Sequence, residues 1–366
     1  SVIYATKAFL CTAMAQLAHE EGLLLDVATG GELFVALHAG VPASRCVMHG
    51  NNKSVVELRE AITAGVRHIV VDSFDELDRI DALHAEGLAV PRVQLRITPG
   101  VYVHTHEYVS TGQNDSKFGF NLANGDAQRA VARARASKSV QLVGLHCHIG
   151  SNVFDTDNFT KAAEVMVQFA NECKLPELTL GGGLGVAYLN NEAAPTITQW
   201  ASALHAATTR LNGDVRVMVE PGRSIVASAA ITVYEVGTIK HIAGVRTYVA
   251  VDGGMSDNPR PVLYGSGYEA FVPARCDADR TLHARIVGKH CESGDVLISE
   301  AVLPADIRVG DVIATPVTGA YGHSMGSNYN KVPRPAVVFV RDGVARVVVR
   351  RETYDDLVRN DATDSV

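Results

Sequence analysis

The sequence predicts a parallel (β/α)8 TIM barrel followed by an all-β domain of β-sandwich or β-barrel-like type. Short apolar runs alternate with amphipathic stretches through the first two-thirds of the chain, which is typical of parallel β-then-α units. Polar residues follow the carboxyl ends of these runs, where barrels build their active sites. After Ser228 the pattern changes to short runs rich in Val, Ile and Thr.

Eight apolar runs are predicted strands of the barrel, namely Val2–Thr6, Leu23–Val27, Cys46–Met48, His68–Val71, Val93–Ile97, Leu142–His146, Leu178–Leu180 and Val215–Val219. Helical patterns follow five of them, at Ala8–Glu21, Ser54–Ala64, Asp75–Glu86, Gly125–Ala136 and Asn158–Glu172. A doubly wound open sheet is the alternative arrangement. The strand ends favour the barrel, because all eight carry polar or glycine residues suited to one shared mouth. These are Lys7, Asp26, His49, Asp72, Arg96, His148, Gly181–Gly183 and Glu220.

The second part of the chain is predicted to be all-β, with domains at 1–228 and 229–366. Its strand-like segments, separated by Gly, Asp and Pro turns, are Ile231–Lys240, Val245–Val251, Leu282–Val287, Val296–Val302, Asp311–Pro316, Ala336–Val340 and Val344–Arg350. Helical periodicity is nearly absent until Tyr354–Arg359. Because the chain opens directly in a strand-like run, we expect that a leader segment precedes Ser1.

Composition excludes several classes of protein. The 366 residues carry a net charge of -7, and no block rich in Lys and Arg provides a face for nucleic acid or an anionic membrane. No apolar run approaches the ~20 residues of a membrane span. The N-terminus does not resemble a signal peptide, and the six cysteines are scattered without a CxxC pair. We therefore expect a reduced, cytoplasmic protein.

Lys7 lies at the end of the first predicted strand. Flanked by Ile3, Tyr4, Ala8 and Phe9, it is expected to be poorly solvated, which disfavours its ammonium form. Such a lysine suits Schiff-base chemistry. The alternative is a lysine whose side chain snorkels to the rim of the barrel.

The last two strand ends suggest a phosphorylated cofactor. The run Gly181–Gly185 could cradle a phosphate with its backbone N–H groups, although a tight turn is the alternative. Val186 stands where a dinucleotide fingerprint needs glycine. Glu220 and Arg223 could simply pair with each other. Together with a lysine and a phosphate loop, however, the glutamate could keep a ring nitrogen protonated. His148 could stack on that ring; the alternative, for it and for His146, is a satisfied core histidine.

The β domain has three polar turns, at Asp252–Arg260, His290–Asp295 and Thr318–Met325. Taken one at a time, each turn is more typical of structure than of function. Cys291 has no metal partner at ligand spacing, so no metal site is expected.

Eight motifs occur in one order along essentially the whole chain. They are Tyr4–Lys7, Asp26–Glu32, His49–Ser54, His146–Ser151, Gly181–Gly185, Glu220–Arg223, Cys291–Asp295 and Gly319–Tyr321. This order resembles the pyridoxal-phosphate-dependent decarboxylases of the alanine-racemase-like fold, and most closely the branch that acts on diaminopimelate. This sequence differs from the family pattern in two ways. The family's N-terminal segment is absent before Ser1, and the connections near Ile239–Gly244 and Phe271–Thr281 are short.

The resemblance implies roles for individual residues. Lys7 would be the Schiff-base lysine, His148 would stack on the cofactor ring, and Glu220 would lie at the pyridine nitrogen. The phosphate would be bound by Ser151, Gly182, Gly183, Gly222 and Arg223, with Tyr321 closing over it. Substrate carboxylate would be held by Arg223, Arg260 and Tyr264, with Tyr321 also lining the substrate. Cys291 would supply the proton to the decarboxylated carbon and Glu292 would contact the distal ammonium. In this family the Cys291 loop comes from the neighbouring subunit, which implies a homodimer.

The implied reaction is decarboxylation of meso-2,6-diaminopimelate to L-lysine and CO2. A thiol suits the reprotonation, because its ordinary pKa of about 8.5 keeps it protonated near neutrality. Ornithine- and arginine-type decarboxylases of the same fold are the alternative. Ornithine enzymes typically have aspartate after the cysteine, whereas this chain has Glu292, and a second substrate carboxylate would explain Arg260. A racemase is disfavoured by Glu220, and a non-catalytic relative by the presence of Lys7 and Cys291.

Overall fold

The structure, a computed structural model, describes residues 1–101 and 112–362. The chain divides into two compact units, the first formed by Ser1–Val186 and Ala193–Ile225 and the second by Ala187–Glu192 and Val226–Val366. The division at 228/229 remains a proposal about domains. No pattern in the sequence indicated that residues 187–192 belong with the second unit.

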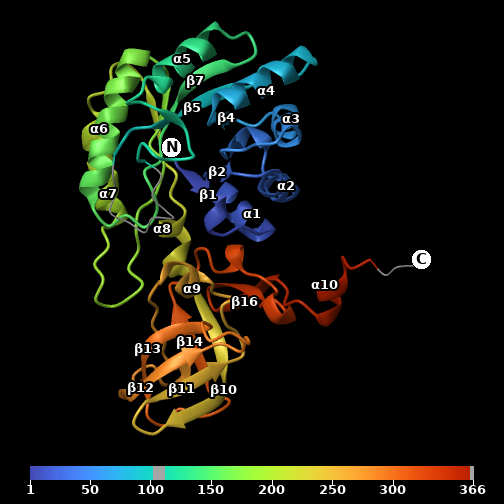
Figure 1. Cartoon of the computed structure of the whole chain (residues 1–366), viewed down its shortest axis with the longest axis vertical. Coiled ribbons are helices and arrows are strands. Elements are labelled where there is room, and N and C mark those ends of the chain that lie inside the picture. The colour runs from blue at the N-terminus through green and yellow to red at the C-terminus, as the bar shows by residue number, and fades with distance from the viewer. Residues whose placement is uncertain (102–111, 363–366) are drawn as a thin grey trace. The chain divides into compact units, whose positions relative to one another are not determined.

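The first unit is a closed barrel of parallel strands (Figure 1). In spatial order they are β1 (Ile3–Ala5), β2 (Leu24–Val27), β3 (Cys46–Met48), β4 (His68–Val71), β5 (Arg92–Thr98), β7 (Gln141–His146), β8 (Glu177–Thr179) and β9 (Arg216–Met218), with β6 (Phe120–Asn121) paired to β5. The ring closes where Val2 bridges Val219 in parallel and the Ile3 N–H donates to Val219 O over 2.8 Å. The predicted barrel is therefore confirmed, and the open-sheet alternative is wrong.

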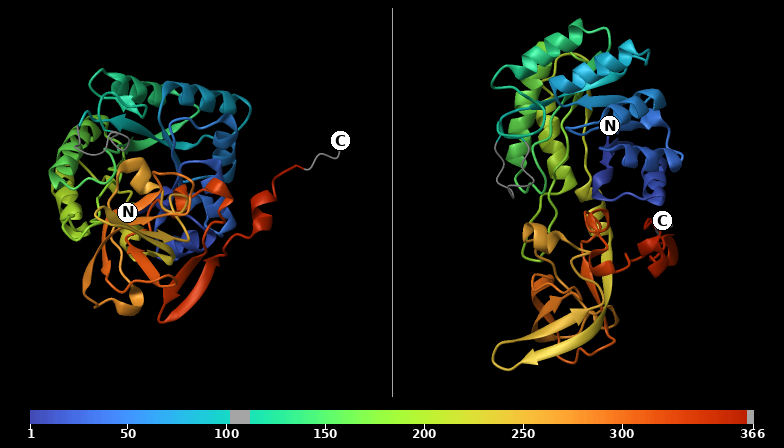
Figure 2. Two further views of the ribbon diagram at one scale, coloured as in Figure 1. Left: turned by 60° about the horizontal axis from the view of Figure 1, so that its bottom comes forward. Right: turned by 45° about the vertical axis from the view of Figure 1, so that its right-hand side comes forward.

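Helices surround the strands of the first unit, as the left view of Figure 2 shows. They are α1 (Thr12–Glu20), α2 (Gly30–His38), α3 (Val55–Ala64), α4 (Phe74–Ala85), α5 (Asp126–Ala136), α6 (Thr156–Cys173), α7 (Ile197–Thr208) and the short α8 (Arg223–Val226). Their ends follow local signals. In α3, for example, Ser54 and Glu57 form a capping box, and Gly65 ends the helix at φ 75°. None of the described helices combines the length and the apolar composition needed to cross a membrane.

The barrel interior is apolar at its centre and polar at its mouth. Five buried side chains from five strands form one cluster, namely Ile3, Leu24, Val47, Val70 and Met218. Such layers of branched apolar residues fill the centre of a parallel barrel and fix the strand ends above them. The polar residues that follow the strands consequently start from rigid positions.

The second unit is built on a five-stranded mixed sheet in the order β13-β12-β11-β10-β14. Its strands are β10 (Ile231–Ile242), β11 (Arg246–Val251), β12 (Arg280–Val287), β13 (Val296–Pro304) and β14 (Val312–Pro316), and β15 (Val337–Arg341) with β16 (Val344–Val349) forms a separate antiparallel pair. The long β10 pairs with β14 through its first half and with β11 through its second. The all-β prediction is confirmed apart from two short helices, α9 (Arg260–Tyr264) and the expected α10 (Tyr354–Val358).

Candidate functional site

Lys7 lies in a 3-10 turn (Thr6–Ala8) directly after β1. Its side chain is exposed, although Tyr4 and Ala8 beside it are fully buried. The expectation of a poorly solvated lysine is thus not met in this chain, because Lys7 projects from the turn rather than from the strand. Burial, followed by the nearby Lys7 charge, holds the pKa of His148 well below its usual value. Lys7 and His148 thus both follow barrel strands, and the charge of Lys7 favours the neutral form of His148.

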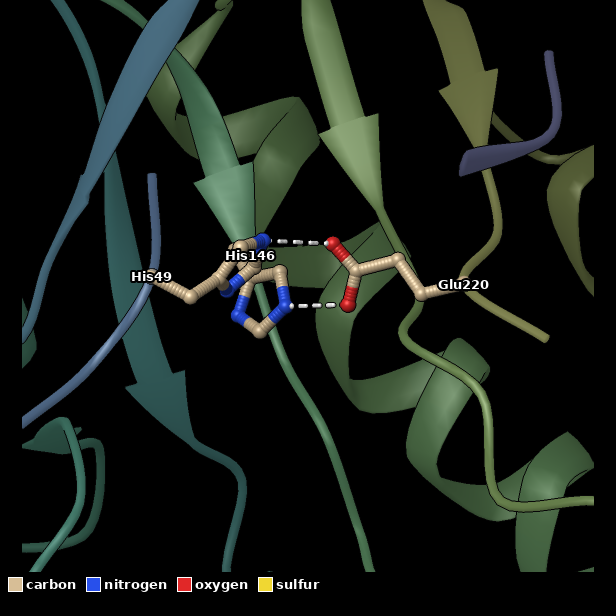
Figure 3. Close-up of side chains that lie close together, drawn as sticks. All are labelled: His49, His146 and Glu220. Atoms are coloured by element: carbon tan, nitrogen blue, oxygen red, sulfur yellow. Dashed lines mark hydrogen bonds and ion pairs between the residues drawn. The ribbon is translucent and has the colours of Figure 1, made fainter. Parts of the chain in front are cut away.

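Glu220 follows β9 and is held by two histidines (Figure 3). His146, the last residue of β7, donates from Nε2 to Glu220 Oε2 over 2.9 Å. His49, which follows β3, brings its Nε2 to 3.0 Å from Oε1. This second contact is an ion pair without hydrogen-bond alignment, so Oε1 is buried with no hydrogen-bond partner among the described residues. His146 is therefore part of the site rather than a mere core residue.

The charge states of these three groups differ. Burial alone would raise the pKa of Glu220, but His146 and His49 outweigh it and hold that pKa well below the usual value. Burial would likewise lower the pKa of His49, but Asp26 and Glu220 raise it above the usual value. For His146, burial dominates and the pKa is lowered. These shifts favour an ionised carboxylate, a protonated His49 beside one oxygen and a neutral His146 beside the other.

This arrangement fits a protonated ring nitrogen. Glu220 Oε1 is an anionic, buried acceptor that lacks a hydrogen-bond donor among the described residues, and a pyridinium N–H would supply one. His49, His146 and Glu220 also offer ligand atoms within 4.8 Å of one another, which is a composition seen in metal sites. The expectation that the protein has no metal stays a prediction.

The glycine run after β8 is required by close backbone packing. A Cβ added to Gly182 would lie 1.9 Å from Glu220 O, and one added to Gly183 would lie 2.2 Å from Gly150 O. The Gly182 N–H donates to His148 Nδ1 over 3.3 Å, which ties the loop to the histidine. Close packing therefore requires these glycines, and the phosphate role of the loop remains a prediction.

A second group of polar side chains lies at the start of α8. The buried Arg223 donates from Nη2 to Ser151 Oγ over 2.9 Å. Gly222 allows the chain before α8 to pack closely against β1, since a Cβ there would lie 2.9 Å from Ala5 O. A guanidinium and a hydroxyl brought together from two loops suit an anion such as phosphate.

The second unit contains the other predicted site residues. Arg260 is 4% exposed and begins α9, and its guanidinium carbon lies 5.9 Å from the Tyr264 ring centroid at the other end of that helix. Arg260 donates to Tyr188 Oη over 2.7 Å and to Ser266 Oγ over 2.9 Å. Within residues 1–101 and 112–362, no carboxylate forms an ion pair with it, so its charge is available for an anionic ligand.

The Cys291 turn is exposed but well anchored. Buried Asp295 accepts hydrogen bonds from the His290 N–H over 2.9 Å and from the Met255 N–H over 2.7 Å. Cys291 N–H donates to Asn330 Oδ1 over 3.2 Å. Both Cys291 and Glu292 are exposed side chains in this chain. The turn thus presents a thiol and a carboxylate outward from a fixed base.

Two further residues complete the description of this turn and its surroundings. Tyr329 Oη donates to Glu292 Oε1 over 2.6 Å. Tyr321 is half-buried with φ 65°, a left-handed conformation in the turn after β14. How Cys291, Glu292 and Tyr321 meet the residues of the first unit remains a prediction.

The predicted site residues divide between the two units. The first unit holds Lys7, His148, Ser151, Gly182, Gly183, Glu220, Gly222 and Arg223, and the second holds Arg260, Tyr264, Cys291, Glu292 and Tyr321. Sequence reasoning gave no role to His49 or Tyr188. The position of His49 directly after the third predicted strand could have indicated a site residue. For Tyr188 the sequence shows only that it follows the glycine run.

Comparison with known proteins identifies the family. Residues 1–227 match the family described as pyridoxal-dependent decarboxylase, pyridoxal binding domain. The diaminopimelate decarboxylase of Mycobacterium tuberculosis strain H37Rv is 48% identical over 98% of this chain and 84% of its own, and that of Bacillus subtilis strain 168 is equally similar over the same shares.

Solved structures agree. Diaminopimelate decarboxylase from M. jannaschii, solved with L-lysine, aligns with a TM-score of 0.92 and 34% identity over 99% of this chain and 85% of that one. A lysine/ornithine decarboxylase from Vibrio vulnificus, at 23% identity and a TM-score of 0.78, shares the fold. With a closed barrel whose mouth holds Lys7, His148 and Glu220, this chain belongs to the pyridoxal-dependent decarboxylases and, among them, to the diaminopimelate decarboxylase family.

Proposed function

We propose that this protein decarboxylates meso-2,6-diaminopimelate to L-lysine and CO2, the last step of lysine biosynthesis, with pyridoxal 5'-phosphate as cofactor. The observation that carries the proposal is similarity to diaminopimelate decarboxylases over 98% of the chain. The ionised Glu220, with Oε1 open to a donor, supports the cofactor chemistry.

Pyridoxal phosphate, when bound, supplies an electron sink for the pair of electrons left on carbon as CO2 departs. The residues of this chain hold it. Lys7 would contribute the amine that binds the cofactor covalently, and Glu220 Oε1 would accept a hydrogen bond from its ring nitrogen. His148 would stack on the ring, and its lowered pKa favours the neutral imidazole there.

The phosphate is assigned to the group around α8. Arg223 and Ser151 are hydrogen-bonded to each other in the chain, and together they provide a cation and a hydroxyl for the phosphate oxygens. The loops of Gly182, Gly183 and Gly222 are assigned to the phosphate as well; because the Gly182 N–H is bonded to His148 Nδ1, the backbone donors would come from Gly183 and Gly222. Tyr321 would close over the phosphate and line the substrate.

Substrate recognition is assigned mainly to the second unit. Arg260 and Tyr264, with Arg223, would bind substrate carboxylate, and the absence of a carboxylate partner for Arg260 among the described residues supports this role. Cys291 donates its thiol proton to the decarboxylated carbon. Glu292 binds the distal ammonium. Its carboxylate is exposed, and the hydrogen bond from Tyr329 helps to hold it in position.

We also propose a homodimer in the cytoplasm. Cys291 and Glu292 are exposed in a single chain, as expected if they act in the active site of the partner subunit. All six cysteines are free thiols, which supports a reducing compartment.

The experiment is to incubate the purified holoenzyme with meso-diaminopimelate and to identify the product by chromatography. L-lysine and CO2 in equal amounts are expected, and the Lys7→Ala variant is the control that must form neither. An active protein that yields putrescine or agmatine from ornithine or arginine, but no lysine, would favour the ornithine/arginine-type alternative.

A further inference from the structure

We infer that His49 is a positioning residue of this enzyme. Held between Asp26 and Glu220, it balances the two carboxylates and keeps Glu220 ionised, with Oε1 directed to the ring nitrogen of the cofactor. The inference rests on the proposed role of Glu220 at that nitrogen, and it adds the reason why a deeply buried carboxylate can fill this role.

One imidazole nitrogen of His49 lies close to two carboxylates. His49 Nε2 lies 3.0 Å from Glu220 Oε1 and 3.7 Å from Asp26 Oδ1. All three side chains are 8% exposed or less, so solvent screens them weakly. Two carboxylates this close to a single imidazole nitrogen favour the imidazolium, because a neutral ring would leave both negative charges uncompensated.

His146 fixes Glu220 at its other carboxylate oxygen, Oε2. His146 donates to Oε2 over 2.9 Å, and its ring packs edge-to-face on His49 at 5.0 Å between centroids. Figure 3 shows both imidazoles pointing at the same carboxylate. With Oε2 satisfied and His49 misaligned for a hydrogen bond, Oε1 keeps a lone pair for another donor.

The loop that carries His49 is held in place by buried hydrogen bonds and an ion pair. The His49 N–H donates to Val27 O over 2.8 Å. The fully buried Lys53 donates to Gly50 O and Val70 O, each over 2.7 Å, and pairs with Glu76 at 2.7 Å. Gly50, directly after His49, has φ 113° and no room for a Cβ, which would lie 2.9 Å from Ala28 O. These contacts hold the imidazole at a fixed distance from Glu220.

The other charged groups near His49 do not change the balance. Burial lowers its pKa, Asp26 and Glu220 raise it, and Arg96 lowers it, with a net rise. His68, on the adjacent strand, has a pKa of about 3 and is neutral. Asp26 and Glu220 thus bring two carboxylates to His49, and a protonated ring nitrogen would add a second positive charge beside Glu220.

The test compares three variants of the holoenzyme, His49→Gln, Glu220→Gln and the control His68→Gln, which alters another buried histidine of the barrel. The readout is the 15N NMR shift of the cofactor ring nitrogen, supplied as 15N-labelled pyridoxal phosphate, which reports its protonation. We expect Glu220→Gln and His49→Gln to move this signal toward the unprotonated value, while His68→Gln leaves it in place. We expect kcat of His49→Gln to fall about ten- to a hundredfold, as for other residues that orient a reacting group.

The outcomes separate the inference from the proposed function. If Glu220→Gln moves the signal and His49→Gln does not, the inference is wrong and the role of Glu220 stands. If neither variant moves it, Glu220 does not lie at the nitrogen and the proposed assignment fails. Should His49→Gln bind no cofactor, 15N-histidine spectra of the wild-type holoenzyme decide. A His49 ring protonated on both nitrogens at neutral pH supports the inference, and a neutral ring overturns it.

Discussion

Arg223 donates a hydrogen bond to Ser151 over 2.9 Å and so joins the start of α8 to the loop that follows β7. The two residues are 72 positions apart in sequence, and their contact forms from the closure of the barrel rather than from any local motif. A cation and a hydroxyl preset in this way need little reorganisation to bind an anion.

The first prediction concerns this contact. Ser151→Ala removes one phosphate donor and leaves Arg223 in place, so we expect pyridoxal phosphate to bind about tenfold more weakly, the effect of one lost hydrogen bond to a charged group. Fluorescence titration of the apoenzyme measures this. Ser202→Ala, on α7, is the matched control, and equal affinity of the two variants would contradict the phosphate assignment.

The second prediction concerns Gly182. Its Cβ would lie 1.9 Å from Glu220 O, a backbone atom that cannot move aside without displacing Glu220. We expect Gly182→Ala to lower the free energy of unfolding by about 1–3 kcal/mol and to weaken cofactor binding. Gly31→Ala is the control, since the nearest atom to its Cβ is 3.7 Å away. Thermal unfolding of both variants measures the difference in stability. A Gly182→Ala variant as stable as the wild type would contradict the prediction.

The sequence predicted the barrel more accurately than it predicted the site. β3 (Cys46–Met48) and β4 (His68–Val71) have the predicted bounds, because strands buried on both faces appear as uninterrupted apolar runs. Helix α9 was missed, since five residues are too few to show periodicity. Residues 187–192 follow the glycine run in sequence, and only tertiary contacts assign them to the second unit.

The partners of each site residue were harder to predict. Sequence order indicated that His49 and Glu220 both end strands, but not that the side chains meet within 3.0 Å. A barrel mouth gathers eight strand ends, so strand order alone leaves many pairs possible. Lys7 was expected to be shielded from solvent by its neighbours, but its side chain is exposed in the turn after β1.

The third prediction concerns pH. Burial lowers the pKa of His68 to about 3 from the ordinary 6.5, so the folded protein keeps this ring neutral while the unfolded chain takes up a proton below pH 6.5. Stability from this group is full above that pH and falls as the pH drops toward 3, by up to about 1.4 kcal/mol per pH unit. His68→Gln cannot take up the proton and should flatten this slope in denaturant unfolding. His205→Gln, on the exposed face of α7, is the control; a wild-type slope in His68→Gln would refute the assignment.

The fourth prediction concerns the dimer. Lys7→Ala and Cys291→Ala should each be inactive, yet if Cys291 acts across the interface, equal mixing should restore about a quarter of wild-type activity, because half of the dimers are hybrids and each has one intact site. Activity is measured after unfolding and refolding the mixed chains together. The absence of recovery, with hybrids verified by differential tagging, would show that Cys291 serves its own subunit.

The most direct test of substrate identity is the comparison of kcat/KM for CO2 release from meso-diaminopimelate, L-ornithine and L-arginine by the same holoenzyme preparation. Because the buried Arg260 has no carboxylate partner among the described residues, a substrate with a second carboxylate should react far faster, by about a thousandfold for a buried charge left unpaired by the others. That preference for diaminopimelate is the result we predict. Comparable or faster release from ornithine or arginine would contradict the proposed substrate while leaving the fold and the cofactor intact.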